Sequence, residues 1–149
     1  DVNVNIKMDI QVLSTLDSIP KQEQLMQWAS ATLNNPEAEL GLRIVDETEA
    51  RQLNNTWRNK DYATNVLSFP VGEKLEQVPD LLGDIVICAP VVEREATEQG
   101  KETLAHWAHL LIHGILHLQG YDHQSDEEAD LMETEEIRIL TELGFAKPY

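Results

Sequence analysis

Basic residues are scarce in this chain. Its 149 residues include 11 lysines and arginines against 27 acids, which gives a net charge of −16. Basic side chains that replace counterions usually supply nucleic-acid affinity, so the bulk charge argues against a polyanionic partner. The charge is unevenly spread, however, because residues 51–72 hold three basic side chains, Arg51, Arg58 and Lys60, and a single acid. The sequence is therefore compatible with a locally positive patch on an acidic body.

Cysteine pairs and long apolar runs are also absent. The one cysteine, Cys88, cannot form an internal disulfide, which favours a reducing, intracellular compartment. No apolar run approaches the ~20 residues of a membrane span. The first residues show no basic patch before an apolar core. We therefore expect a cytoplasmic protein with neither a membrane segment nor a signal peptide.

Alternating and apolar segments predict four strands. Residues 2–12 and 39–46 alternate with a period of two, which is typical of half-buried strands. Residues 66–69 and 82–88 are short apolar runs that also favour strands. The polar stretch 72–79 between them is expected to be a flexible loop.

Helical spacing predicts five helices, at residues 20–33, 46–57, 90–99, 102–119 and 125–143. The expected N-caps are Ser18, Asp46 with Glu49, and Ser125 with Glu128, and the expected stops are Gly120 and Gly144. We expect Trp57 in the core, and a solvated acidic face on the last helix over the apolar stripe Leu131, Ile137 and Leu140. The order of elements indicates one α+β domain over residues 1–149, with helices packed on a mixed four-stranded sheet.

Three histidines gather at the end of the longest predicted helix. His113 and His117 are four residues apart, so both imidazoles project from one helical face. Gly120 lets the backbone turn, so that His123 can swing back toward them. Three neutral imidazoles with an open fourth position are typical of a catalytic zinc site, whereas structural sites usually close all four positions. The spacing therefore predicts one Zn²⁺, or another divalent transition metal, bound by these three histidines.

Two further histidines lie on the same predicted helix. His109 shares the face of His113, but on a straight helix it lies about 12 Å along the axis from His117. One ion with bonds near ~2.1 Å cannot bridge that gap. We interpret His109 as a core residue or a neighbour that supports a ligand, and His106 as a surface residue.

The histidine spacing matches the metzincin protease motif H-E-x-x-H-x-x-G-x-x-H with one exception. Gly114 stands where that motif has the glutamate that acts as general base. A glycine cannot accept a proton. The metal site is therefore retained, while the peptidase chemistry loses its base.

Three segments between residues 57 and 123 form a recognisable set. They read W-R-N-K-D at 57–61 leading to T-N-V-L-S-F-P at 64–70, L-G-D-I at 82–85, and H-G-I-L-H-L-Q-G-Y-D-H at 113–123. Together they resemble the bacterial YbeY family of metal-dependent endoribonucleases. A-T-N at residues 63–65 departs from the usual P-T-D of that family, which removes a carboxylate near the expected site.

The resemblance implies properties that the residues alone do not give. It implies a single α+β domain, zinc, a cytoplasmic location, and action on single-stranded RNA, including the end of small-subunit ribosomal RNA. The corresponding role is ribosomal-RNA maturation and ribosome quality control. It also implies that Arg58 and His113 matter for activity. A ribosomal protein or a GTPase as partner could supply the positive charge that this chain lacks.

Elementary chemistry suggests roles for the polar residues near these motifs. Arg58 offers a planar fork of donors that suits a phosphate, and Lys60 is a weaker phosphate-binding candidate. Asp122 could orient the imidazole of His123 or stabilise the turn before it. Asp84 could support a metal ligand or lie as a charge on an edge strand.

Two alternatives to a zinc-dependent endoribonuclease stay open. One is a metallopeptidase of the metzincin type with a displaced base. The other is a non-catalytic interaction module, in which the metal only holds the helix end to the following loop. Arg58 near the metal would favour RNA over peptide, and an open coordination position would argue against the module.

Overall fold

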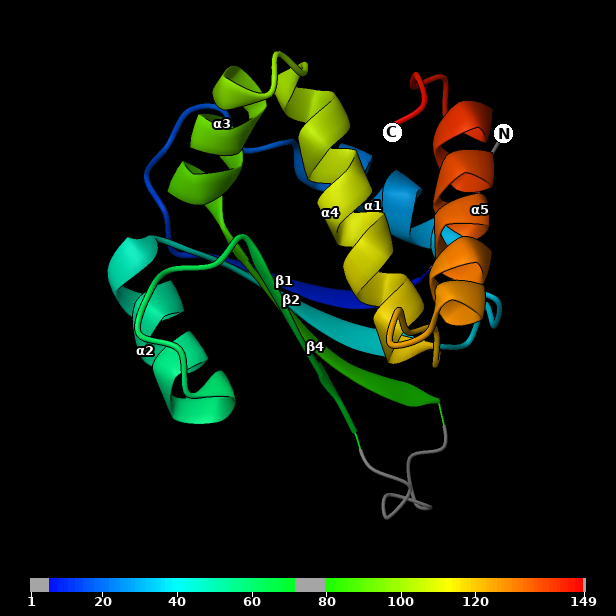
Figure 1. Cartoon of the computed structure of the whole chain (residues 1–149), viewed down its shortest axis with the longest axis horizontal. Coiled ribbons are helices and arrows are strands. Elements are labelled where there is room, and N and C mark those ends of the chain that lie inside the picture. Colours follow the sequence, from blue (N-terminus) through cyan, green and yellow to red (C-terminus); the bar gives the residue numbers. More distant parts are fainter. Residues whose placement is uncertain (1–5, 72–79, 149) are drawn as a thin grey trace.

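The computed structural model describes residues 6–71 and 80–148, and a four-stranded sheet runs through this part (Figure 1). The strands are β1 (Lys7–Val12), β2 (Glu39–Val45), β3 (Val66–Pro70) and β4 (Leu81–Cys88), in the order β1-β2-β4-β3. β1, β2 and β4 are parallel, and β3 is antiparallel to β4. The predicted mixed sheet is confirmed, while the predicted strand residues 2–5 and the predicted loop 72–79 lie outside the described residues.

The described residues form the helices α1 (Gln22–Thr32), α2 (Glu47–Arg58), α3 (Ala89–Glu98), α4 (Thr103–Leu118) and α5 (Asp126–Glu142). α4 lies over one face of the sheet with α1 and α5 beside it, whereas α2 lies at the opposite face (Figure 1). The expected α+β domain with helices packed on a sheet is confirmed. Within residues 6–71 and 80–148, no helix combines the length and the apolar character needed to cross a membrane.

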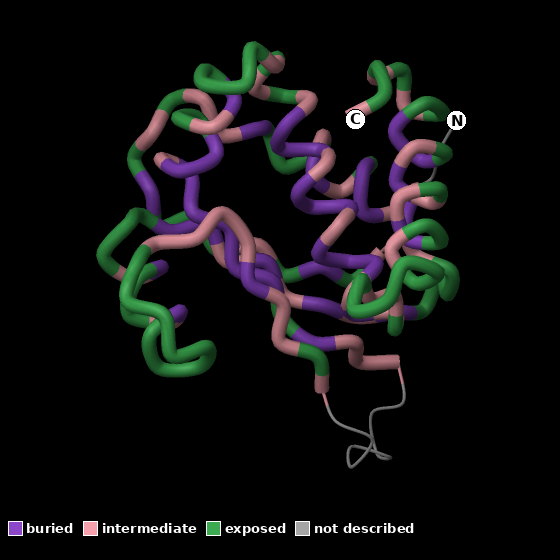
Figure 2. The backbone as a smooth tube through the Cα atoms, viewed as in Figure 1, coloured by how far each residue is buried: buried purple, intermediate pink, exposed green. Residues whose placement is uncertain are grey.

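The alternation of β4 divides the apolar core in two. Ile85 and Ile87 belong to the main core under α4, whereas Val86 and Cys88 pack with residues of α2. Figure 2 shows that buried residues continue along α4, while α2 is mostly exposed. α4 is largely apolar because it lies between the sheet and the helices α1, α3 and α5. Its large, fully buried side chains are Trp107, Leu111, Ile112, Ile115 and Leu116.

The predicted capping box at the start of α2 is wrong. Asp46 does precede the helix, but its side chain caps no helical N–H and instead accepts a hydrogen bond from the Ser14 hydroxyl at 2.5 Å. Glu49, the other member of the predicted box, pairs with the Arg43 guanidinium. Partners outside the helix therefore replace the local cap at both carboxylates, one after β1 and one on β2.

The two other predicted N-caps differ in outcome. The predicted N-cap at Ser18 is wrong, because the Ser18 hydroxyl donates to Glu93 at 3.0 Å and α1 begins only after Lys21. Ser125 is confirmed, since its hydroxyl oxygen accepts the backbone N–H of Glu128 at 3.1 Å.

Two residues expected to be buried are exposed. Trp57 is 63% exposed, because it lies on the last turn of α2, beside an open cleft, where its ring forms an edge-to-face pair with Phe69. Leu131 is 65% exposed, because the buried row of α5 runs at a different phase of the helix from the predicted stripe. Leu140 is buried as expected, and the row that contains it consists of Met132, Glu136, Ile139 and Leu140.

Candidate metal centre

The end of α4 is built around Gly120. This residue has a φ of +102°, a left-handed conformation that glycine adopts without the strain that a Cβ would bring. Its N–H donates to the carbonyl of His117 at 3.0 Å, and the next N–H, of Tyr121, donates to the carbonyl of Leu116 at 3.0 Å. These bonds close the helix and reverse the chain, which brings His123 back to the face of α4.

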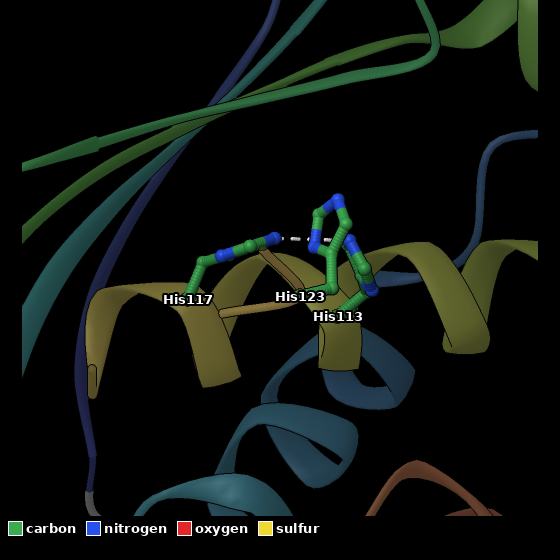
Figure 3. A group of neighbouring side chains, drawn as sticks. All are labelled: His113, His117 and His123. Atoms are coloured by element: carbon green, nitrogen blue, oxygen red, sulfur yellow. Dashed lines mark hydrogen bonds between the residues drawn. The ribbon is translucent and has the colours of Figure 1, made fainter. Parts of the chain in front are cut away.

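The three predicted histidines converge (Figure 3). The Nε2 atoms of His113 and His117 are 3.2 Å apart, and one ring nitrogen from each of the three residues lies within 4.8 Å of the others. His123 comes from the loop after α4, and its ring centroid is 5.1 Å from that of His117 and 5.8 Å from that of His113. The structure therefore brings together all three residues of the predicted set.

This donor set fits a divalent transition metal. Tetrahedral ligation with bonds near ~2.1 Å places two ligand nitrogens about 3.4 Å apart, close to the 3.2 Å between the His113 and His117 nitrogens. Burial, reinforced by the neighbouring His113 and His123, lowers the pKa of His117 below its usual range. His117 is therefore neutral near pH 7, as a metal ligand must be. His123 is exposed, so the cluster opens toward solvent on one side.

Glu136 is the residue of the site that sequence reasoning missed. It is fully buried on α5, where its Oε2 lies 2.5 Å from Nδ1 of His113 and its Oε1 lies 3.0 Å from Nε2 of His109, both within hydrogen-bond distance. His109 therefore supports His113 through a shared carboxylate, in agreement with its interpretation as a supporting neighbour. A sequence signal was present, because Glu136 follows Met132 and precedes Leu140 by four residues in an apolar row, where a carboxylate is unusual.

Gly114, which stands in place of the protease glutamate, lies close to the sheet. A Cβ at this position would lie 3.2 Å from two side-chain atoms of Ile85 and 3.3 Å from the Ser68 hydroxyl. That hydroxyl also approaches the carbonyl of Gly114 at 3.3 Å. α4 thus touches β3 and β4 at this point, and any side chain at position 114 would have to displace side chains of the sheet.

A cleft of about 680 Å³ separates two walls of the site. The helix wall consists of His113, His117 and the loop that carries His123. The strand wall consists of the end of α2, the segment after it and β3, and it contributes Arg58 and Lys60. The structure therefore places both predicted phosphate-binding residues in the same cleft as the histidines.

Arg58 is the last residue of α2 and is exposed. Its Nη2 donates to the carbonyl of Ser68 at 2.8 Å, and its guanidinium carbon lies 5.4 Å from the ring centroid of Phe69. Among the residues that the structure describes, Arg58 pairs with no carboxylate. A guanidinium that is held by one carbonyl and an aromatic ring keeps donors available for a phosphate.

Asn65, which stands in place of the family's usual aspartate, has a tertiary partner. Its Nδ2 donates to Oε1 of Glu95 at 2.9 Å, and the same oxygen lies 2.9 Å from Nε2 of His106. His106 is only 4% exposed, so its interpretation as a surface residue is wrong. The exposed face expected at residue 106 is covered because α3 packs against α4 there and supplies Glu95.

The two remaining acids lie differently from each other. Asp122 accepts the backbone N–H of His123 at 2.8 Å, while its carboxylate is 3.9 Å from the ring nitrogen Nδ1, which favours the turn-stabilising interpretation. Both interpretations of Asp84 are wrong, because β4 is an interior strand and Asp84 points away from the histidines. It lines a separate cleft of about 710 Å³ on the α2 face of the sheet.

Fold and site together define a class of protein. It is an α+β domain in which the end of a long helix and the loop after it present three histidines to a cleft, the arrangement of an open three-histidine metal centre. The chain belongs to the YbeY family, whose family model, described as Endoribonuclease YbeY, matches residues 7–144.

Individual relatives agree with this membership. Proteins named Endoribonuclease YbeY from Pseudomonas fluorescens and Pseudomonas syringae pv. syringae are each 55% identical to this chain over 97% of its length, and the matches cover 96% and 88% of those proteins. The solution structure of TM1509 from Thermotoga maritima is similar in fold, with a TM-score of 0.57 and 28% identity over 90% of this chain and 91% of that one. The family resemblance of the three sequence segments is thereby confirmed.

Proposed function

We propose that this chain is a zinc-dependent endoribonuclease that cleaves single-stranded RNA. In this proposal it acts in the cytoplasm on small-subunit ribosomal RNA, during its maturation and in ribosome quality control. The observation that carries the proposal is the meeting, in one cleft, of a three-histidine cluster and an arginine that pairs with no carboxylate among residues 6–71 and 80–148. Membership of the YbeY family, and the name Endoribonuclease of the relatives, support the choice of RNA as substrate.

The residues of the cleft have different roles in the proposed reaction. A divalent ion held by His113, His117 and His123 would act as a Lewis acid and lower the pKa of water that it binds. Arg58, across the cleft, would donate two parallel hydrogen bonds to a phosphate and stabilise the charge that develops on it. Lys60 would add a weaker point charge on the same wall. Tyr62 is 54% exposed in the cleft and offers a ring on which a base can stack.

Two observations disfavour a peptidase. Position 114 holds a glycine, and side chains of the sheet would be in tight contact with any Cβ placed there. The buried carboxylate nearest to the cluster, Glu136, engages the Nδ1 side of His113, away from the nitrogen that faces His117. Neither position offers a general base to the cleft. The exposed His123 and the open cleft likewise disfavour a module in which metal is purely structural.

The net charge of −16 sets the expected mode of RNA binding. Few phosphate contacts are available, so RNA affinity should be weak and should change little with salt concentration. In this proposal a partner protein, such as a ribosomal protein or a GTPase, supplies the missing positive charge and holds the RNA near the cleft.

Parallel cleavage assays test the proposal. Purified chain with its metal content measured is given single-stranded RNA in one reaction and an unstructured peptide in another, with and without a chelator. We expect chelator-sensitive cleavage of RNA alone, and none by His113→Ala protein, because that variant lacks a ligand. Chelator-sensitive proteolysis by the wild type would instead favour the peptidase.

A further inference from the structure

A single buried carboxylate joins two histidines of α4. Glu136 has no exposed surface, and its two oxygens face different imidazoles, Oε2 toward Nδ1 of His113 and Oε1 toward Nε2 of His109. The carboxylate comes from α5, whereas both histidines come from successive turns of α4. The contact therefore links the two helices directly behind the metal-binding face.

The burial of Glu136 determines which ring nitrogens carry hydrogen. A buried carboxylate is costly unless it accepts hydrogen bonds, so both imidazoles are expected to donate to it. In a neutral imidazole only one nitrogen is a donor, and the other keeps its lone pair. For His113, hydrogen on Nδ1 leaves the lone pair on Nε2, which is the atom 3.2 Å from Nε2 of His117.

We propose that Glu136 is a positioning residue of the metal centre. It fixes the Nδ1–H tautomer and the ring orientation of His113, so that Nε2 is presented to the ion, and His109 holds its second oxygen in place. The carboxylate also places a negative charge one imidazole away from the cation, which favours cation binding. This inference rests on the metal site of the proposed function but is independent of whether RNA is the substrate.

The position of Glu136 excludes a role as general base. Both of its oxygens are engaged by imidazoles, and it lies on the Nδ1 side of His113, away from the atom that faces the cleft. It therefore acts on the reaction only through His113. This assignment separates it from Glu135, its neighbour on the acidic outer face of α5, which binds Arg138 instead.

A glutamine at position 136 tests the proposal, with Glu135→Gln as the matched control on the same turn of the helix. Glu136→Gln keeps the shape of the side chain but turns one acceptor into a donor, so one imidazole faces an NH₂ group. We expect zinc affinity, measured by competition with a chromophoric chelator, to fall roughly 10- to 100-fold. Glu135→Gln should stay within about twofold of the wild type, because its partner is an exposed arginine. Zinc affinity of Glu136→Gln equal to that of the wild type would overturn the proposal.

Nitrogen-15 imidazole spectra of the metal-free wild type provide a second measurement that needs no variant. We expect His113 as the Nδ1–H tautomer, assigned by the loss of its signals in His113→Gln protein. A His113 that carries its hydrogen on Nε2 would contradict the proposal, even if Glu136→Gln failed to fold. Because neither measurement uses RNA, loss of the nuclease proposal alone would leave both expected results unchanged.

A change at His109 tests the second hydrogen bond of Glu136. His109→Gln should lower zinc affinity less than Glu136→Gln does. The reason is that His109 bonds to Oε1 of Glu136, whereas Oε2 is the atom that meets His113. The visible absorption of the Co²⁺-loaded proteins, which reports ligand geometry, should shift in Glu136→Gln and hardly change in Glu135→Gln. An equal or larger loss of affinity in His109→Gln would show that Glu136 is not the positioning residue.

Discussion

On the helix wall of the cleft, the His113 side chain is 26% exposed and its partner Glu136 is 0% exposed. On the strand wall, Arg58 and Lys60 are exposed, and Arg58 is held by one backbone carbonyl and the face of Phe69. Buried hydrogen bonds fix geometry, whereas exposed side chains on the surface can adapt. The difference suggests that the helix wall is built to hold an ion and the strand wall to receive a substrate of variable shape. Variants that affect one wall and spare the other test this division.

The largest effect is expected on the helix wall from His123→Ala. This change removes one of three ligands, so zinc affinity should fall by more than the roughly 100-fold that loss of a supporting partner costs. Metal content after dialysis against a dilute chelator gives the readout, and Gln124→Ala, at the exposed neighbouring position, is the control. Full occupancy in the His123→Ala protein would mean that the third ligand is a different residue.

A separate effect is expected on the strand wall from Arg58→Ala. Turnover of single-stranded RNA should fall roughly 100-fold, because a donor to the reacting phosphate is lost, while zinc content and thermal stability stay the same. Arg58→Lys should recover only part of the rate, since an ammonium cannot form the bidentate fork. Arg51→Ala is the matched control, because Arg51 lies on the same helix but pairs with Asp61. Wild-type turnover in Arg58→Ala would make Arg58 a plain surface charge.

The contact between the two walls is tested at Gly114. Gly114→Glu rebuilds the protease motif but drives a carboxylate into Ile85 and Ser68, so we expect a loss of about 2–3 kcal/mol in the free energy of unfolding. Peptidase activity should not appear. Gly114→Ala should be nearly neutral, because a gain of up to ~1 kcal/mol in helix propensity offsets the close contact. Chemical denaturation measures both variants, and a fully stable Gly114→Glu would show that the helix and the sheet are not in tight contact there.

The smallest effect is expected on the outer face of α5. Hydrogen bonds from Arg138, followed by its charge, lower the pKa of Glu135 below its usual range. A depressed carboxyl pKa stabilises the fold above the group's ordinary pKa of 4.5, and this contribution is lost as the pH falls through the lowered value. Because the pair is partly exposed, Arg138→Ala should cost at most about 0.5 kcal/mol at pH 7 and less at pH 4. A larger cost, or one that grows on acidification, would show that charge on the outer face of α5 matters as much as the buried Glu136.

The histidine cluster could be predicted because its parts are local. His113, His117 and His123 lie within eleven residues, and helix periodicity with one glycine stop is enough to bring them together. Glu136 could not be predicted in the same way, because its role depends on how α5 packs against α4. Only the phase of that contact places this carboxylate, and not its neighbour Glu135, behind the histidines.

For the fold, too, local patterns predict the elements but not the contacts between them. The order of strands and helices follows from periods of two and 3.6, and the mixed sheet was expected from it. The predicted burial is wrong at two residues in opposite directions: Trp57 is exposed and His106 is buried. Trp57 lines the cleft between α2 and the sheet, while His106 lies where α3 supplies Glu95, and neither arrangement can be read from the sequence near the residue.

RNA cleavage measured while the metal is removed and returned tests whether the three-histidine centre carries the reaction. Wild-type protein is stripped with a chelator, reloaded with Zn²⁺ in steps, and assayed in single turnover on one single-stranded RNA at each measured occupancy. We expect a rate that rises in proportion to occupancy up to about one ion per chain, with no rise in a His123→Ala protein. Cleavage that persists in metal-free protein, or fully loaded protein that leaves RNA intact even with ribosomal components present, would contradict this expectation.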